Sequence, residues 1–291
     1  RLNPRTNGPH TAEALSRITV ARIDDGIEHV FDAPRETSLG DVEYSPDGSR
    51  LLFTLTRYNG IEAWLMEVAT GQVRPLSDAS VNAAWGNPCD WLDHNATVIC
   101  RFKASARGAP PAPPEVPVGP NIQTHTGGAA PIRTYQDLLA NAHDEALFDY
   151  YFTAQIATID LATGSRTSIG QPGLYHQVSA SPDGNYFLVV EVQQPFSWLV
   201  TARSFPKDVT IRNRSGELLA TVATLPLADT VPIGGVATGP RDFVWNPAVP
   251  HTLVWAEALD GGDPRQTVPH RDRLLSHTAP FNDDPTELAR T

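Results

Sequence analysis

Serine side chains are the first candidates for chemistry, because a serine nucleophile of the α/β-hydrolase type lies at the centre of a Gly-x-Ser-x-Gly pentapeptide. No such pentapeptide occurs in the sequence. A serine in a turn has a structural role, because its hydroxyl forms hydrogen bonds with nearby backbone groups. The serines in segments of turn composition are Ser38, Ser49, Ser165 and Ser215. The sequence therefore offers no catalytic residue.

Histidines could bind a metal ion if their spacing brought them together. Among the 9 histidines, His143 is followed directly by Asp144 and Glu145, and adjacent positions of a helix point to different faces. His270 and His277 lie in a segment typical of strand and turn, and neither has a partner at a metal-ligand spacing. Solvated or hydrogen-bonded histidines are the favoured interpretation, so we predict neither a metal site nor a cofactor.

Paired carboxylates could act as general acid and base if they lay in opposed environments. Here each pair lies in a turn segment beside glycine or proline, where aspartate stabilises the local backbone. The pairs are Asp24–Asp25, Asp260 with Asp263, and Asp283–Asp284. Glycine-rich phosphate loops of known spacing are also absent.

Cys89 and Cys100 are the 2 cysteines, which are too few for a disulfide scaffold or a zinc cage. They flank a short predicted hairpin, so a bridge between them is geometrically conceivable. Two small buried residues with free thiols are the favoured interpretation. Because their redox state stays open, they do not fix a cellular compartment; a bacterial periplasmic or secreted location is slightly preferred.

The charge balance argues against polyanionic partners. There are 22 basic and 33 acidic residues, which gives a net charge of −11. This charge repels nucleic acid and anionic membrane surfaces, so we expect neither as a partner. No apolar stretch reaches the roughly 18 residues needed to span a bilayer. The first residues contain no apolar signal-peptide core, so we expect that any signal peptide was removed or never present.

A repeated unit predicts the fold. Residues 41–78 contain four short strands joined by three tight turns, Pro46–Gly48, Tyr58–Gly60 and Ala69–Gly71. The Ser-Pro-Asp-Gly sequence of residues 45–48 recurs at 181–184, and the Ala-Thr-Gly sequence of residues 69–71 recurs at 162–164. Four antiparallel strands in a regular repeat are typical of a β-propeller blade. We therefore predict an all-β protein, a partial propeller of about four and a half blades.

The blade boundaries follow from these repeats. The predicted units are a half blade at 14–34 and blades at about 41–78, 80–170, 173–225 and 238–291. The second full blade would begin with a strand at Val81–Trp85. In a closed propeller each blade packs on two neighbours. The half blade at 14–34 has no other half before it, which indicates a larger ring that is truncated at both ends. A hydrolase domain is expected to be absent from the chain.

Three insertions interrupt the repeat. Residues 105–150 contain a proline-rich stretch, Gly108–Pro117, which should be extended, and a helix at Thr134–Tyr150 that is expected to break near Asn141. Insertions this long are usually functional or mobile, so a lid, an oligomer contact or a domain contact would suit this one. The insertions at 193–207 and 259–265 carry aromatic and basic residues, which could form a recognition surface.

Short motifs along nearly the whole chain are shared with a known family. They are Asn3–Gly8, Tyr44–Gly48, Asn87–Trp91, Gly119–Gln123, Thr134–Leu139, His143–Phe148, Pro195–Ser197, Arg203–Pro206, Gly239–Arg241 and Glu257–Pro264. These motifs include the insertions as well as the repeats, which makes the likeness specific. Through them the chain resembles the propeller of the glutamyl endopeptidases, a branch of the prolyl oligopeptidase-type serine peptidases.

This resemblance implies a parent enzyme with a seven-bladed propeller followed by an α/β-hydrolase domain. That domain would hold a Ser, Asp and His triad and cleave peptide bonds after glutamate. The propeller would admit peptides and unfolded segments and exclude larger substrates. The implied partners of this chain are therefore the hydrolase domain and peptide substrates, and the chain by itself is expected to be non-catalytic.

A site specific for glutamate needs a cation to bind the substrate carboxylate, and arginine does this best through a bidentate bond. Arg203 and Arg265 lie on loops that could face the hydrolase domain, so they are our candidates for binding the acidic side chain. The alternative for each is an ion pair with a nearby aspartate within the propeller. For the whole chain, the alternative functions are a stand-alone propeller used as a protein-binding scaffold and an independent propeller enzyme.

Overall fold

The computed structural model describes residues 2–10, 14–92, 95–115, 119 and 135–291. These residues form two compact units. The first unit comprises Arg1–Gly108 and Tyr151–Gly173, and the second comprises Ala109–Tyr150 and Leu174–Thr291. No helix in the described residues has the length and apolarity to cross a membrane.

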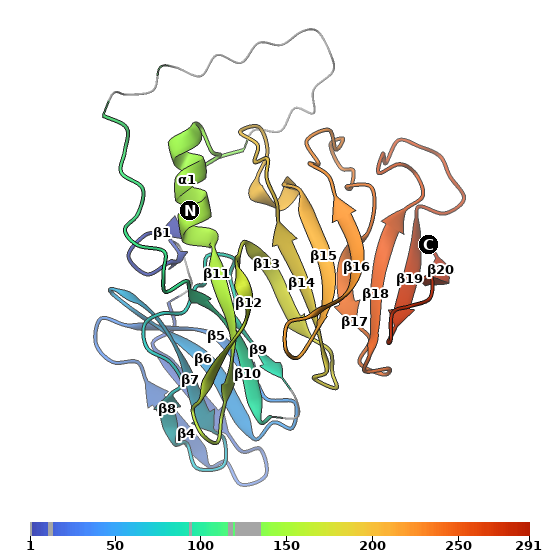
Figure 1. The fold of residues 1–291 in the computed structure, drawn as a ribbon. Coiled ribbons are helices and arrows are strands. Elements are labelled where there is room, and N and C mark those ends of the chain that lie inside the picture. Colours follow the sequence, from blue (N-terminus) through green and yellow to red (C-terminus); the bar gives the residue numbers. More distant parts are fainter. Residues whose placement is uncertain (1, 11–13, 93–94, 116–118, 120–134) are drawn as a thin grey trace. The chain divides into compact units, whose positions relative to one another are not determined.

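The first unit consists of antiparallel sheets (Figure 1). Two sheets are two-stranded: β1 (Leu2–Asn3) with β2 (Gly8–Pro9), and β3 (Arg17–Ala21) with β4 (Glu28–Asp32). One four-stranded sheet follows chain order: β5 (Ser38–Tyr44), β6 (Arg50–Arg57), β7 (Gly60–Glu67) and β8 (Val73–Pro75). The other contains β9 (Cys89–Leu92), β10 (Thr97–Lys103), β11 (Ala154–Asp160) and β12 (Arg166–Gly173).

The second unit contains two further four-stranded antiparallel sheets (Figure 1). The first contains β13 (Tyr175–Ala180), β14 (Tyr186–Val192), β15 (Lys207–Asn213) and β16 (Leu218–Leu225). The second contains β17 (Arg241–Trp245), β18 (Thr252–Ala258), β19 (Asp272–Thr278) and β20 (Thr286–Arg290). Helix α1 (Ala142–Phe152) precedes β11, and the 3₁₀ turn η1 (Ala202–Ser204) lies between β14 and β15. The predicted all-β class with four-stranded antiparallel sheets is confirmed.

The repeated Ser-Pro-Asp-Gly segments form the same turn in both units. The Ser45 hydroxyl donates to Asp47 Oδ1 at 2.8 Å, and the Arg50 N–H donates to the Ser45 hydroxyl oxygen at 2.9 Å. Ser181 and Asp183 repeat the first of these bonds. The glycine that ends each motif has a positive φ, 71° at Gly48, which glycine adopts without a steric penalty. The turn explains why the sequence repeats there.

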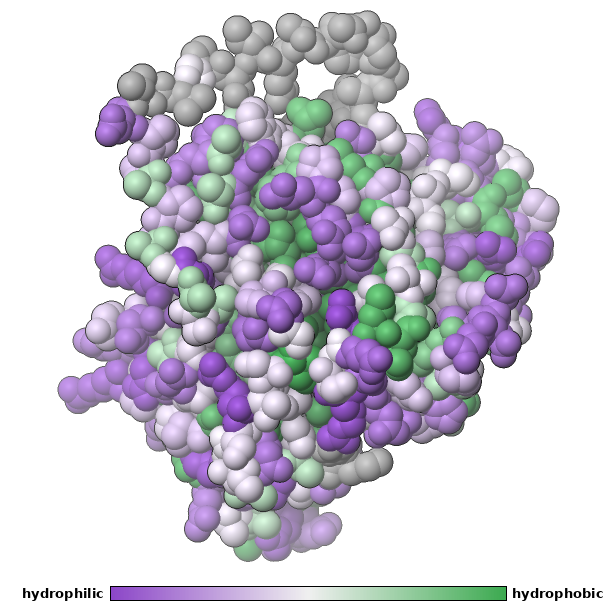
Figure 2. Space-filling view, in the orientation of Figure 1, coloured by the Kyte–Doolittle hydropathy of each residue, from purple (hydrophilic) through white to green (hydrophobic). Residues whose placement is uncertain are grey.

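Neighbouring sheets within each unit pack face to face through apolar side chains. In the first unit, Phe53, Leu55 and Met66 lie in a buried cluster with residues of β3. A second cluster joins the β5–β8 sheet to the β9–β12 sheet, and a third joins the two sheets of the second unit. Because the central strands of a sheet with both faces covered are apolar on both sides, β6 has five consecutive buried residues. On the face seen in Figure 2, hydrophilic residues predominate and small apolar areas interrupt them.

The strand predicted at Val81–Trp85 is wrong. Val81 makes only an isolated bridge to Phe102, and the strand beside β10 is β9. The side chain of Asn82 is the physical reason, because its amide donates to the carbonyl oxygens of Tyr151 and Thr153 at 3.1 and 3.0 Å. These bonds hold the segment as a loop, although Val81 and Ala83 are buried.

The helix is shorter than the sequence predicted. It begins at Ala142, whereas the expectation was Thr134, and it ends at Phe152; Thr134 itself lies outside the described residues. The Asn141 side chain accepts a hydrogen bond from the Asp144 N–H at 2.9 Å. An asparagine that accepts from a first-turn N–H is a favourable N-cap, so the expected break near Asn141 is the start of the helix.

The preference for free thiols is also wrong, because Cys89 and Cys100 form a disulfide. The two residues face each other directly on β9 and β10, with their Cα atoms 4.1 Å apart. The bridge therefore links the adjacent strands of one hairpin, as the sequence had left open.

Candidate functional site

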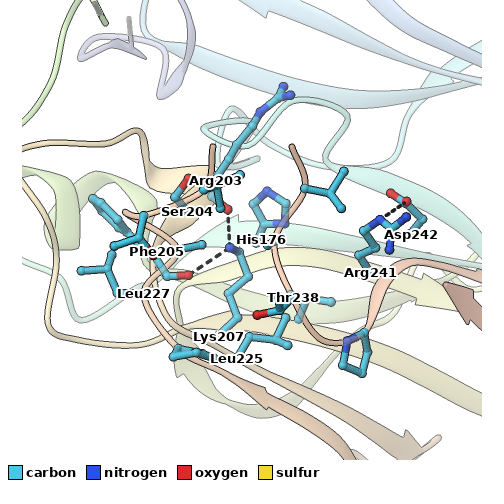
Figure 3. A pocket seen from close by; sticks show the side chains of 18 of the residues that line it. His176, Arg203, Ser204, Phe205, Lys207, Leu225, Leu227, Thr238, Arg241 and Asp242 are labelled. Atoms are coloured by element: carbon cyan, nitrogen blue, oxygen red, sulfur yellow. Dashed lines mark hydrogen bonds and ion pairs between the residues drawn. The ribbon is translucent and has the colours of Figure 1, made fainter. Parts of the chain in front are cut away.

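The second unit contains a cavity of about 510 Å³ (Figure 3). Its lining comes from several elements of this unit. These are the start of β13, Val190 of β14, the Arg203–Lys207 segment, the end of β16, the connection from Pro226 to Pro240, the start of β17, and Gly261. A volume of this size lies within the range of small-molecule sites in proteins. We therefore take this cavity as the candidate functional site.

Three phenylalanines hold the segment that forms one wall of the cavity. The Phe205 ring, 2% exposed, stacks on Phe196 at a centroid distance of 5.3 Å and meets the edge of Phe148 at 5.6 Å. Phe148 lies on α1, and nearby the Trp198 indole N–H donates to Glu145 Oε1 at 2.6 Å. These contacts fix the 193–207 insertion, which the sequence had marked as unusual, against the helix.

Lys207 is the first residue of β15 and is only 8% exposed. Its ammonium donates to the backbone carbonyl oxygens of Arg203 and Phe205, the latter at 3.0 Å (Figure 3). In the part of the chain that the structure describes, no carboxylate lies within ion-pair distance of it. Burial therefore disfavours the charged form and lowers the pKa of Lys207 to about 8.

Lysine is rare in this protein, which makes the position of Lys207 more informative. Lys103 and Lys207 are the only lysines in the sequence, and the other basic residues among the 22 are arginines. Lys103 lies in the first unit, where it donates to the carbonyl oxygen of Ala79 at 3.1 Å and where burial also lowers its pKa. Solvated positive charges in this chain are therefore carried by arginine, and both lysines have backbone carbonyls as partners.

Two arginines add charge to the cavity lining. Arg241 pairs with Asp272 at 2.7 Å and with Asp242 at 3.4 Å, so its charge is compensated. Arg203 is exposed, and among the described residues its guanidinium has no carboxylate within ion-pair distance. In Figure 3 the Arg203 side chain extends away from Lys207, while its carbonyl oxygen accepts from Lys207.

The two arginines singled out from the sequence occupy different environments. Arg203 lines the cavity, whereas Arg265 does not. The Arg265 guanidinium makes a bidentate pair with Asp263, with both Nε–Oδ1 and Nη2–Oδ2 at 2.9 Å. Its hydrogen bonds lower the pKa of Asp263 to about 2. Arg265 thus has the local aspartate partner that was the alternative interpretation, while its side chain is 80% exposed.

Sequence reasoning missed Lys207 and Arg241. The scarcity of lysine was a signal that could have pointed to Lys207, and the shared motif Gly239–Arg241 was a signal that could have pointed to Arg241. Within the described residues, no group of three His, Cys, Asp or Glu side chains could hold a metal ion.

Stability should rise with pH because of Lys207. Below about pH 8 the lysine is protonated in both folded and unfolded states, so its contribution is constant. Above that value the folded protein releases a proton that the unfolded chain keeps up to its ordinary pKa of 10.5, so the free energy of unfolding increases by about 2 kcal/mol between pH 8 and 9.5. Guanidinium unfolding at several pH values measures this increase.

A Lys207→Met variant provides the control, since it retains the smaller contribution of Lys103 and loses that of Lys207. Its free energy of unfolding should rise distinctly less over the same pH interval. An equal rise in both proteins would show that Lys207 is not the group responsible.

Comparisons with known proteins connect this chain to peptidases. No family model matches the sequence. It is 33% identical over 283 residues to the "Probable glutamyl endopeptidase, chloroplastic" of Oryza sativa subsp. japonica, and 35% identical over 263 residues to the protein of the same name from Arabidopsis thaliana. These matches cover 91% and 87% of this chain but only 30% and 27% of the plant proteins.

Among solved structures, a putative dipeptidyl aminopeptidase IV from Bacteroides ovatus is similar, with a TM-score of 0.52 and 10% sequence identity. The match covers 95% of this chain and 37% of that one, and at this identity it concerns the fold alone. The sequence matches are of a different kind, because they combine one third identity with nearly the whole length of this chain. The chain is homologous to part of the plant glutamyl endopeptidases, which confirms the resemblance seen in its motifs.

Proposed function

We propose that this chain is a non-catalytic segment of a serine peptidase similar to glutamyl endopeptidase. The observation that carries the proposal is the 33% identity over 91% of the chain to a probable glutamyl endopeptidase. The chain spans about 30% of the length of that relative. The activity therefore belongs to a larger protein, most of which lies outside the matched region.

The segment is proposed to be an arc of a β-propeller, about four and a half blades of seven. The four-stranded antiparallel sheets support this, since each follows chain order as propeller blades do. The apolar clusters between neighbouring sheets within each unit support it as well. The half blade would be 14–34, and the blades would be 41–78, 80–170 with its insertion, 173–225 and 238–291.

In this proposal the catalytic triad lies in an α/β-hydrolase domain of the same parent protein. The absence of a Gly-x-Ser-x-Gly pentapeptide from the 291 residues supports a nucleophile elsewhere. The propeller segment gates the access of peptides to that domain, so peptides and unfolded segments enter while folded proteins are excluded. A cofactor has no part in this chemistry, because a serine triad and its oxyanion hole are sufficient for peptide hydrolysis.

Arg203 and Arg265 are the proposed ligands of an acidic substrate side chain. Arg203 is the stronger candidate, since its exposed guanidinium has no carboxylate partner among the described residues. Arg265 would have to exchange Asp263 for the substrate. In the complete peptidase, Arg203→Gln should raise KM for glutamyl peptides about tenfold with kcat nearly unchanged, because a charge-assisted hydrogen bond is lost in both ground and transition states.

The matched control is Arg22→Gln, which removes an exposed arginine paired with Asp25 in the first unit. Its KM should equal that of the wild type. The variant Arg265→Gln is expected to show a smaller rise than Arg203→Gln. If neither variant changes KM for glutamyl peptides relative to the control, the two arginines do not bind the substrate carboxylate.

Expression of the complete reading frame that encodes this sequence tests the proposed function. Residues 1–291 alone should not hydrolyse glutamyl peptides, whereas the complete product should cleave after glutamate and should leave folded proteins intact. Activity of residues 1–291 alone would contradict a non-catalytic segment. A complete product without peptidase activity would favour a binding scaffold.

A further inference from the structure

The cavity in the second unit is apolar over much of its wall. Its apolar lining includes Val190, Phe205, Leu225, Val231, Val236 and Phe243. Removal of apolar area from water favours binding. A ligand of this cavity therefore gains from an apolar body, and polar groups are needed only at a few positions to orient it.

Lys207 is the buried charged residue of the cavity lining. An ammonium has three N–H donors, and the structure assigns acceptors to it from two backbone carbonyl oxygens, those of Arg203 and Phe205. A buried ammonium without a counter-ion is unfavourable, and neutral carbonyls compensate only part of the lost hydration. An anion in the cavity would supply both the missing charge and a further acceptor.

The charged side chains of the cavity lining carry an excess of positive charge. The charged lining residues are Arg203, Lys207, Arg241 and Asp242, with His176 as a further titratable group. Asp242 is 3.4 Å from Arg241, which also pairs with Asp272. Among the described residues, the charges of Arg203 and Lys207 thus remain without a carboxylate partner. This local excess of positive charge lies in a protein of net charge −11.

We infer that this cavity is a binding site for a free carboxylate on an apolar body, with the ammonium of Lys207 as the ion-pair partner. The carboxylate would accept from Lys207, and a body of two or three apolar residues would lie along Phe205 and the Val231–Val236 connection. The apolar C-terminal end of a peptide and an alkanoic acid both have this chemistry. The inference depends only on the cavity and holds whether or not the chain works with a hydrolase domain.

Calorimetric titration of the 291-residue chain tests it with paired probes. Acetyl-Leu-Leu with a free carboxylate is compared with its C-terminal amide, and octanoate is compared with octanol. At pH 7 at least one acid should bind, and its neutral counterpart should bind at least tenfold more weakly, because a charge-assisted bond to a desolvated ammonium is lost. Preference for the peptide acid or for octanoate then identifies the source of the ligand.

The two lysines allow a second measurement on the unmodified chain. Acetic anhydride at low concentration acetylates both, and mass spectrometry follows each site separately. The bound acid should slow acetylation of Lys207 at least threefold and leave the rate at Lys103, in the first unit, unchanged. This result does not depend on any variant folding correctly.

Lys207→Met should abolish the difference between acid and neutral probe, whereas the matched Lys103→Met should preserve it. The inference is overturned if neither acid binds, if acid and neutral probes bind equally, or if Lys207 is not protected. Because residues 1–291 suffice for these measurements, failure here leaves the proposed peptidase function to its own test.

Discussion

Phe205→Ala is expected to destabilise the second unit by about 3–5 kcal/mol, the usual cost of removing a buried phenylalanine. The ring is 2% exposed and contacts both Phe196 and Phe148. Its removal leaves a void beside the cavity and weakens the attachment of the 193–207 segment to α1, which is then held by the Phe196–Phe148 contact and by the Trp198–Glu145 hydrogen bond. Guanidinium unfolding gives the loss of free energy.

Hydrogen exchange locates the effect. In Phe205→Ala, amide exchange should accelerate in residues 142–150 and 193–207, because these segments lose one of the apolar contacts that they share. Leu218→Ala is the matched control, since Leu218 is 51% exposed on β16 of the same unit, and it should change stability by less than about 0.5 kcal/mol. A Phe205→Ala protein as stable as this control would refute the anchoring role of the aromatic cluster.

Gly262→Ala is expected to cost about 2–4 kcal/mol, the sum of a backbone and a steric effect. Gly262 has a φ of +74°, which is unfavourable for alanine, and a Cβ there would collide with the carbonyl oxygen of Val236. The two segments are already joined, because the Val236 N–H donates to the Gly262 carbonyl oxygen at 3.1 Å. Alanine would therefore push apart two loops that meet beside the cavity.

The neighbouring glycine separates the two effects. Gly261 has a similar φ of +68°, but nothing lies within 4 Å of its Cβ position. Gly261→Ala should therefore cost only about 1–2 kcal/mol, the backbone contribution. Chemical unfolding of both variants measures the difference, and equal losses would mean that the close approach to Val236 is not rigid.

The sheets were predictable because their turns are specified locally. Asp47 and Asp183 accept hydrogen bonds from backbone and side chains within two residues, and a motif of this kind can be recognised without knowing what packs on it. The segment Val81–Trp85 was not predictable for the opposite reason. Val81 and Ala83 are buried, but side-chain bonds from Asn82 to Tyr151 and Thr153, some 70 residues away, keep the segment from joining a sheet.

The candidate site could be predicted only in part. Arg203 was identified by its residue type and loop position, and it does line the cavity. Lys207 was missed because its role depends on its burial in the folded unit, where it lines the cavity together with Phe205 and the connection after β16. The disulfide was left open because the register of β9 and β10 decides whether Cys89 faces Cys100.

The location of the reactive serine tests the non-catalytic role of this chain most directly. The complete reading frame is expressed, labelled with a fluorophosphonate that reacts with activated serines, digested and analysed by mass spectrometry. The label should be found on one serine outside residues 1–291, and labelling should abolish cleavage after glutamate. A labelled serine within residues 1–291 would contradict the assignment of this chain as a non-catalytic segment.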